Sequence, residues 1–137
     1  MQDRPVKKNQ ELELDITDMA FGGVAIGKIH TEQGDFTVFV QNAIPGQRVL
    51  ARVEKAQKRF AECKLVKVLK PSSQEVSIPY QPIPGAPYAT LPIELQHHYK
   101  RRNTLELFKR IAKLEHIESC MDAFIESPSV WHYRNKM

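Results

Sequence analysis

The sequence predicts a mainly β chain: a small closed barrel of five short strands, then a proline-rich segment, one long helix and a final incomplete strand. Three observations support this fold class. Apolar and polar residues alternate in five stretches between residues 11 and 70, which is typical of half-buried strands. Six of the nine prolines lie between Pro71 and Pro92, where they exclude a sheet ladder or a helix. Helical spacing of apolar residues begins after Pro92.

The strands are expected at residues 11–17, 22–29, 35–40, 47–55 and 60–69. Gly22-Gly23 predicts a tight turn before the second strand, and Gly27 predicts a bend or bulge within it. A change of alternation near Leu65-Val66 predicts a second bulge. Strands this short and this regularly spaced favour a barrel, because closure removes the exposed edges of a sheet.

The chain is expected to divide into a barrel at residues 6–70, a linker at 71–92 and a third part at 93–137. The third part would hold a helix from Ile93 to about Ile117, with an apolar stripe through Leu105, Phe108 and Ile111. Residues 127–137 resemble the opening of a strand, whose aromatic side chains need neighbours to bury them. We therefore expect the chain to be the front part of a longer protein, with residues 93–137 beginning an incomplete central domain.

Composition excludes several classes of protein. The 137 residues are 42% hydrophobic, which is enough for a core, but no apolar stretch approaches the ~18 residues of a membrane helix. Residues 1–10 are polar and basic, unlike a secretory signal. The two cysteines lie far apart in sequence, without the spacing of a redox or metal motif. A cytoplasmic protein with reduced thiols and no membrane partner is expected.

Charge is unevenly distributed along the chain. Residues 11–35 carry six acids and one base, whereas residues 48–70 carry eight bases and two acids. The second stretch indicates either a polyanion-binding surface or a solubilising strand face.

Catalytic arrangements are nearly absent, and we expect no catalytic residue and no metal site in this chain. His97 and His98 are adjacent, so on a helix they diverge by about 100° and cannot share an ion. Cys63 lies in a strand, as a small core residue does. The glycine run at residues 22–27 lacks the following helix that a phosphate loop needs.

The best candidate for a binding site is the hairpin tip at residues 55–60, which combines three cations with an aromatic ring. Cations bind phosphate, and an exposed ring can stack on an unpaired base. The alternative is that Phe60 packs into the barrel end while the cations hydrate the turn. The residues predicted to bind RNA are Lys28, Arg48, Lys55, Lys58, Arg59 and Phe60.

Together these residues resemble a TRAM domain. The resemblance rests on residues 22–28, 39–40 and 43–49 and on the 55–60 tip, in that order. It implies an OB-like barrel that binds RNA. Further along, Pro79-Tyr80, the helix through Arg110 to Glu115, Ser127-Pro128 with Trp131, and Tyr133-Arg134-Asn135-Lys136 resemble RNA uracil-5-methyltransferases.

This second resemblance implies a parent enzyme that methylates carbon 5 of a uridine in rRNA or tRNA with S-adenosylmethionine. In that family a cysteine of a later domain attacks carbon 6 of uracil, and a carboxylate removes the proton from carbon 5. None of these parts is expected within residues 1–137, so the fragment alone would bind RNA without catalysing the reaction. No obligate protein partner is implied.

Many members of the family hold an iron–sulfur cluster through cysteines in the segment corresponding to residues 78–87. Here those positions carry Ile78, Pro84 and Pro87. A cluster needs thiolate ligands, so we expect none.

Three other functions are compatible with the sequence. One is a stand-alone RNA-binding module without enzymatic activity. Another is a relative of the methylthiotransferases, in which a TRAM domain usually ends the chain. The third is a structural interaction through the apolar stripe of the helix.

Overall fold

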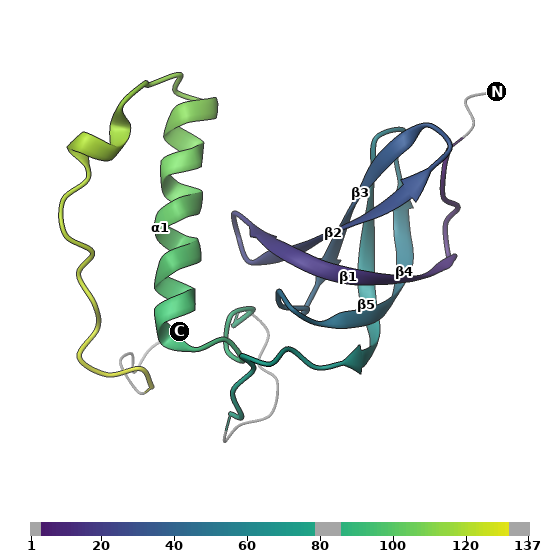
Figure 1. Cartoon of the computed structure of the whole chain (residues 1–137), viewed down its shortest axis with the longest axis horizontal. Coiled ribbons are helices and arrows are strands. Elements are labelled where there is room, and N and C mark those ends of the chain that lie inside the picture. Colours follow the sequence, from purple (N-terminus) through teal and green to yellow (C-terminus); the bar gives the residue numbers. More distant parts are fainter. Residues whose placement is uncertain (1–3, 79–85, 132–137) are drawn as a thin grey trace. The chain divides into compact units, whose positions relative to one another are not determined.

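The computed structural model describes residues 4–78 and 86–131. It divides the chain into two compact units, residues 1–92 and 93–137. The strands belong to the first unit and the long helix to the second (Figure 1).

Five strands close into a barrel in the order β1-β2-β3-β5-β4. Only the β3–β5 pair is parallel among the strand pairs of the described residues. Closure gives every strand two hydrogen-bonded neighbours, which removes unpaired edges. The mainly β fold class with an OB-like five-stranded barrel is therefore confirmed. The strands are β1 (Glu11–Ala20), β2 (Val24–Thr31), β3 (Gly34–Gln41), β4 (Arg48–Ala56) and β5 (Phe60–Lys70).

The alternation seen in the sequence builds the core. On β1, Leu12, Leu14 and Ile16 are buried while the acids between them are exposed. The same pattern buries the inward residues of the other strands, because successive side chains of a strand point to opposite faces. The core residues contributed by β2 to β5 are Ala25, Phe36, Val38, Val40, Val49, Ala51, Val53, Ala56, Ala61 and Cys63.

The tight turn predicted at Gly22-Gly23 is confirmed, whereas the bulge beside Gly27 lies on β1: Ile16 pairs with Gly27 and Asp18 with Ile26, so Thr17 is the extra residue. Gly22 and Gly23 have φ values of 89° and 81°, a region that glycine enters without steric cost. Gly27 of β2 lies opposite Ile16 of β1, where the two paired strands approach each other closely. A Cβ on Gly27 would lie 2.4 Å from Leu14 Cδ1 and 2.7 Å from the carbonyl oxygen of Asp15.

Register shifts mark the bulges of the barrel. Leu50 pairs with Lys67 and Ala51 with Leu65, so Val66 is the extra residue on β5. The bulge predicted near Leu65-Val66 is confirmed. On β4, the pairs shift between Val53 and Lys55, which makes Glu54 an extra residue beside the hairpin tip.

The proline-rich segment is fastened to the barrel. The Glu75 carboxylate accepts hydrogen bonds from Gln47 Nε2 and from the Ser72 amide, both at 3.2 Å. The Val76 amide donates to the Thr90 carbonyl at 2.8 Å, and Leu91 is 1% exposed. Of the prolines that the sequence places in the linker, Pro79, Pro82 and Pro84 lie outside the described residues.

In the second unit, α1 runs from Ile93 to Arg110 and a short 3₁₀ helix from Ile117 to Cys120. The expectation that the long helix reaches Ile117 is wrong. Lys113 and His116 adopt the left-handed conformation, which a helix interior does not accommodate. Ile111 is 75% exposed, so the apolar stripe gains no burial there that would extend the helix.

The final strand expected at residues 127–137 is not formed in its described part, residues 127–131. The Tyr133-Arg134-Asn135-Lys136 motif lies outside the described residues. Within the part of the chain that the structure describes, no helix has the length and apolarity to cross a membrane.

Candidate nucleic-acid interface

Two of the six residues predicted to bind RNA, Lys28 and Phe60, lie on the outer surface of β2, β3 and β5. Arg48 and Lys55 belong to β4, and Lys58 and Arg59 lie in the turn between β4 and β5. Lys28 on β2 pairs with Thr37 on β3, which pairs in turn with Phe60 on β5. In the next row on the same face, Phe39 lies opposite Glu62. The register therefore brings Lys28 and Phe60 onto one face of the barrel, although they are far apart in sequence.

Three phenylalanines mark this face, and we call Phe21, Phe39 and Phe60 the aromatic face. The rings of Phe39 and Phe60 meet edge to face, with centroids 5.7 Å apart and planes at 78°. Phe21 is 64% exposed. A hollow of about 570 Å³ opens between them, lined by Ala20, Phe21, Val24, Phe39, Gln41, Glu54, Phe60, Glu62 and Cys63.

Of the three rings that line the hollow, the sequence predicted a role for Phe60 only. The signal for Phe39 was present, because Phe36, Val38 and Val40 fill the inward positions of β3 and leave Phe39 on the outer surface. Phe21 had no such signal, since it lies in the turn between β1 and β2.

The cations of the hairpin tip adjoin this hollow along the chain without lining it, and its charged lining residues are Glu54 and Glu62. Lys58 and Arg59 are exposed and directly precede Phe60. Neither they nor Lys28 forms an ion pair with a described residue. Their charges are therefore available to an external anion.

Two other predicted residues already have acidic partners. The guanidinium of Arg48 donates to Glu13 at 2.9 Å and to Asp15 at 3.0 Å, and these hydrogen bonds raise the pKa of Arg48 above its ordinary value. Lys55 lies 3.6 Å from Glu62. A paired cation offers less to a phosphate than an unpaired one, because the new contact must compete with an existing one.

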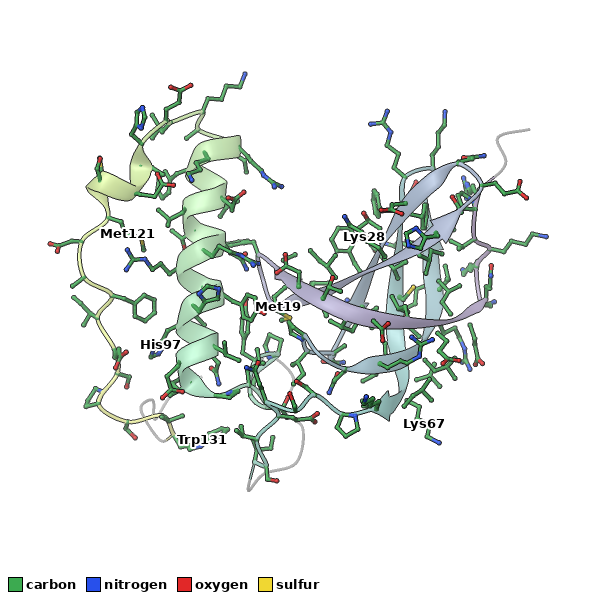
Figure 2. All side chains as sticks on the ribbon, viewed as in Figure 1. Met19, Lys28, Lys67, His97, Met121 and Trp131 are labelled. Carbon is green, nitrogen blue, oxygen red and sulfur yellow. The ribbon has the colours of Figure 1, made fainter. Side chains whose placement is uncertain are left out.

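The uneven charge of the sequence is thus partly cancelled by the fold. β1 pairs with β4, which places the acids of residues 11–15 beside the arginines of residues 48–52. Arg52 likewise pairs with Glu11 at 3.0 Å. The lysines of β5, namely Lys64, Lys67 and Lys70, form no ion pair within the described ranges. Lys67 lies well apart from Lys28 on the barrel (Figure 2).

Cys63 forms part of the floor of the hollow. It is 2% exposed, and burial, with a smaller contribution from the Glu54 carboxylate, raises its pKa to about 11. A thiol this reluctant to ionise is a poor nucleophile. The interpretation of Cys63 as a small core residue agrees with this environment.

Residues 4–78 and 86–131 contain no group of three histidines, cysteines or acids that could hold a metal ion. His97, on the helix (Figure 2), lies 3.2 Å from a Glu126 oxygen and against the ring of Phe124, whereas His98 contacts Tyr99. The candidate interface thus consists of three phenylalanine rings around a hollow, with the exposed cations Lys58 and Arg59 next to Phe60 in the chain.

Comparison with known proteins agrees with this description. Residues 5–66 match the TRAM domain family, which confirms the resemblance drawn from the sequence. Over 136 residues the chain is 34% identical to a Clostridium acetobutylicum protein named as an uncharacterized RNA methyltransferase, covering 97% of this chain and 29% of that protein. A protein of Enterococcus faecalis with the same description is 30% identical, covering 99% of this chain and 29% of that protein.

The chain thus spans less than a third of the length of these relatives. A solution structure of a conserved protein from Methanococcus maripaludis is 36% identical, covering 49% of this chain and 90% of that one, with a TM-score of 0.42.

Proposed function

We propose that the TRAM domain at residues 5–66 binds RNA through its aromatic face and the cations beside it. The observation that carries this proposal is a hollow lined by three phenylalanine rings, one of which, Phe60, directly follows the exposed cations Lys58 and Arg59 in the chain. The cations would neutralise phosphates, while a ring would stack on an unpaired base. Stacking needs a base that is free of its duplex, so the surface favours single-stranded or looped RNA.

The chain would serve as the RNA-engaging front part of an RNA methyltransferase. The names of the relatives support this coarser proposal. The finer proposal is an S-adenosylmethionine-dependent enzyme of the cytoplasm that methylates carbon 5 of a uridine in rRNA or tRNA. It rests on the resemblance of the Tyr133-Arg134-Asn135-Lys136 segment to RNA uracil-5-methyltransferases.

In this scheme the barrel holds the substrate, and residues beyond this chain bind the methyl donor and attack the base. The contribution of residues 1–137 is affinity and orientation. We therefore expect the chain alone to bind RNA and to transfer no methyl group. Incubation of the longer protein with RNA and S-adenosylmethionine, followed by nucleoside mass spectrometry, tests the finer proposal, since the product would be 5-methyluridine.

RNA binding is tested by fluorescence anisotropy with a labelled single-stranded RNA. The Phe39→Leu/Phe60→Leu variant keeps apolar volume but removes both rings. It should weaken binding by roughly tenfold or more, since stacking on an aromatic side chain contributes about 1–3 kcal/mol per base. Phe108→Leu is the matched control, because Phe108 is an exposed ring of the second unit.

The electrostatic part is tested by a salt titration of the Lys58→Gln/Arg59→Gln variant. Loss of two phosphate contacts should lower the slope of log affinity against log salt by about 1.4, at about 0.7 per contact for a single strand. The Arg101→Gln/Lys113→Gln variant removes the same charge from exposed positions of the second unit. An unchanged slope in the first variant, or an equal loss in the second, would contradict the proposed surface.

A further inference from the structure

A second hollow lies near the same hairpin tip, formed by the segment that precedes β1. Its volume is about 560 Å³, and it is lined by Arg4, Val6, Lys7, Lys8, Glu54, Lys55, Ala56 and Gln57. We call residues 4–10 the arm; they form the purple segment that leads into β1 (Figure 1). The sequence predicted no binding role for the arm cations Arg4, Lys7 and Lys8, because residues 1–10 have the composition of an ordinary polar N-terminus.

The arm is a fixed part of the barrel. The Asn9 amide donates to the Val53 carbonyl at 2.8 Å, and the Val53 amide donates to the Gln10 carbonyl at 2.9 Å. The Lys7 amide is bonded to Gln10 Oε1 at 2.9 Å, and Val6 is 1% exposed. The side chains of the arm are therefore presented from an anchored backbone, which reduces the entropy that binding would cost.

The charges around this hollow are unbalanced. Four cations and one carboxylate line it. Arg4, Lys7 and Lys8 form no ion pair with any residue that the structure describes, and Lys55 is held by Glu62 at 3.6 Å. Gathering like charges around a concave surface is unfavourable until an anion enters, and concavity strengthens the field that attracts one.

The two hollows are neighbours. Glu54, the bulged residue of β4, lines both of them. Gln57 lines the arm hollow and Phe60 the aromatic one, so only Lys58 and Arg59 separate them along the chain. A nucleotide strand that places a base on the aromatic face can thus continue around the tip toward the arm.

We propose that Arg4, Lys7, Lys8 and Lys55 form a phosphate subsite for the backbone of a single-stranded RNA whose base occupies the aromatic hollow. The inference rests on the proposed function and extends it by assigning a different part of the RNA to each hollow. The aromatic face reads bases, and the arm binds the sugar–phosphate backbone without regard to sequence.

The test compares two labelled probes of about twelve nucleotides, within the span that OB folds occupy. One is a single-stranded RNA, and the other is an abasic ribose–phosphate oligomer of equal length. The Arg4→Gln/Lys7→Gln/Lys8→Gln variant should weaken binding of both probes by a similar factor, roughly tenfold or more at low salt. Its salt slope should fall by about 2, at about 0.7 for each of three lost contacts.

The Phe39→Leu/Phe60→Leu variant should weaken binding of the RNA and leave binding of the abasic probe unchanged. The Arg101→Gln/Arg110→Gln/Lys113→Gln variant controls for net charge, since it removes three cations from exposed positions of the second unit. Circular dichroism and thermal unfolding verify that each variant folds.

The outcomes separate the two proposals. If the unmodified chain binds neither probe at any salt concentration, the proposed function falls and the subsite falls with it. If it binds RNA but the arm variant keeps its affinity and slope, the phosphate subsite is wrong while RNA binding stands. An equal loss in the net-charge control would also overturn the subsite, because the effect would then be general.

Discussion

At the scale of single residues, environment decides what a side chain can do. Cys63 illustrates this, because the sequence offers a thiol and the barrel removes its reactivity through burial, with the pKa raised to about 11. Cys120, on the 3₁₀ helix, is exposed. Two residues of one type therefore differ in accessibility for reasons that only the fold supplies.

We expect Ellman's reagent to label Cys120 in the native protein at about pH 8 and to reach Cys63 only after denaturation, because the reagent reacts with an accessible thiolate. A Cys120→Ala variant should then show no rapid labelling. Rapid labelling of that variant without denaturant would contradict the buried, protonated state of Cys63.

The raised pKa also predicts a dependence of stability on pH. A thiol whose pKa is higher in the folded state than in the unfolded state contributes stability that is fully present below the unfolded value of 9.0. That contribution is lost as pH rises toward about 11. Urea unfolding of the unmodified chain and of Cys63→Ala across this range checks the prediction. As pH rises, the unfolding free energy of the unmodified chain should fall relative to that of Cys63→Ala.

Among the residues predicted to bind RNA, the sequence could give the type of side chain but not its partners. Lys58 and Arg48 look alike as isolated cations. The β1–β4 register brings Glu13 and Asp15 within 3.0 Å of the Arg48 guanidinium and leaves Lys58 exposed. Ion pairs between residues more than thirty positions apart depend on strand pairing, which alternation alone does not specify.

At the scale of elements, the barrel is joined to the segment after it by a buried amide. Gln47 is 5% exposed; its oxygen accepts from the Ile44 amide at 3.0 Å, and its nitrogen donates to Glu75 at 3.2 Å. One side chain thus supports both the loop between β3 and β4 and the start of the proline-rich segment.

Gln47→Ala should lower the free energy of unfolding by about 1–3 kcal/mol, since it leaves the buried Ile44 amide without a partner. Urea denaturation measures the change. Gln33→Ala is the matched control, because Gln33 is exposed in the turn between β2 and β3, and its effect should stay within about 0.5 kcal/mol. Equal effects of the two substitutions would show that Gln47 does not play this bridging role.

Element prediction succeeded where local pattern and tertiary contact agree. Alternation located the five strands, and its interruption located the Val66 bulge, because both follow from which face is buried. The end of α1 was misjudged, since the apolar stripe continues past Arg110 in sequence without being buried there. The helical spacing of apolar residues shows that a segment could bury one face. Where the helix ends depends on whether that face is buried in the folded chain.

At the scale of the whole molecule, the number and placement of the cysteines decide whether residues 1–137 could hold an iron–sulfur cluster. The chain has two cysteines, one inside the barrel and one exposed on the 3₁₀ helix. Of the positions at which the family resemblance would place cluster ligands, Ile78 and Pro87 are described and Pro84 is not.

We therefore expect the chain, purified without oxygen and reconstituted with iron and sulfide, to retain no stoichiometric iron or acid-labile sulfide, because a cluster of this type requires several thiolates. Colorimetric iron and sulfide assays measure both, and a visible charge-transfer band near equimolar iron would contradict the expectation. A characterised iron–sulfur protein carried through the same procedure serves as the positive control.

The Val76–Thr90 hydrogen bond changes how much length the proline-rich stretch can contribute to the chain. Left free, residues 71–92 could extend by ~3.1 Å per residue and act as a slack tether. Here Glu75 is bonded to Gln47 of the barrel, Val76 is bonded to Thr90, and Leu91 is buried, so the two described ends of the stretch are held close to each other within the first unit. The residues between Val76 and Thr90 therefore add no distance between those two points of the chain, however far a free segment of that composition could extend.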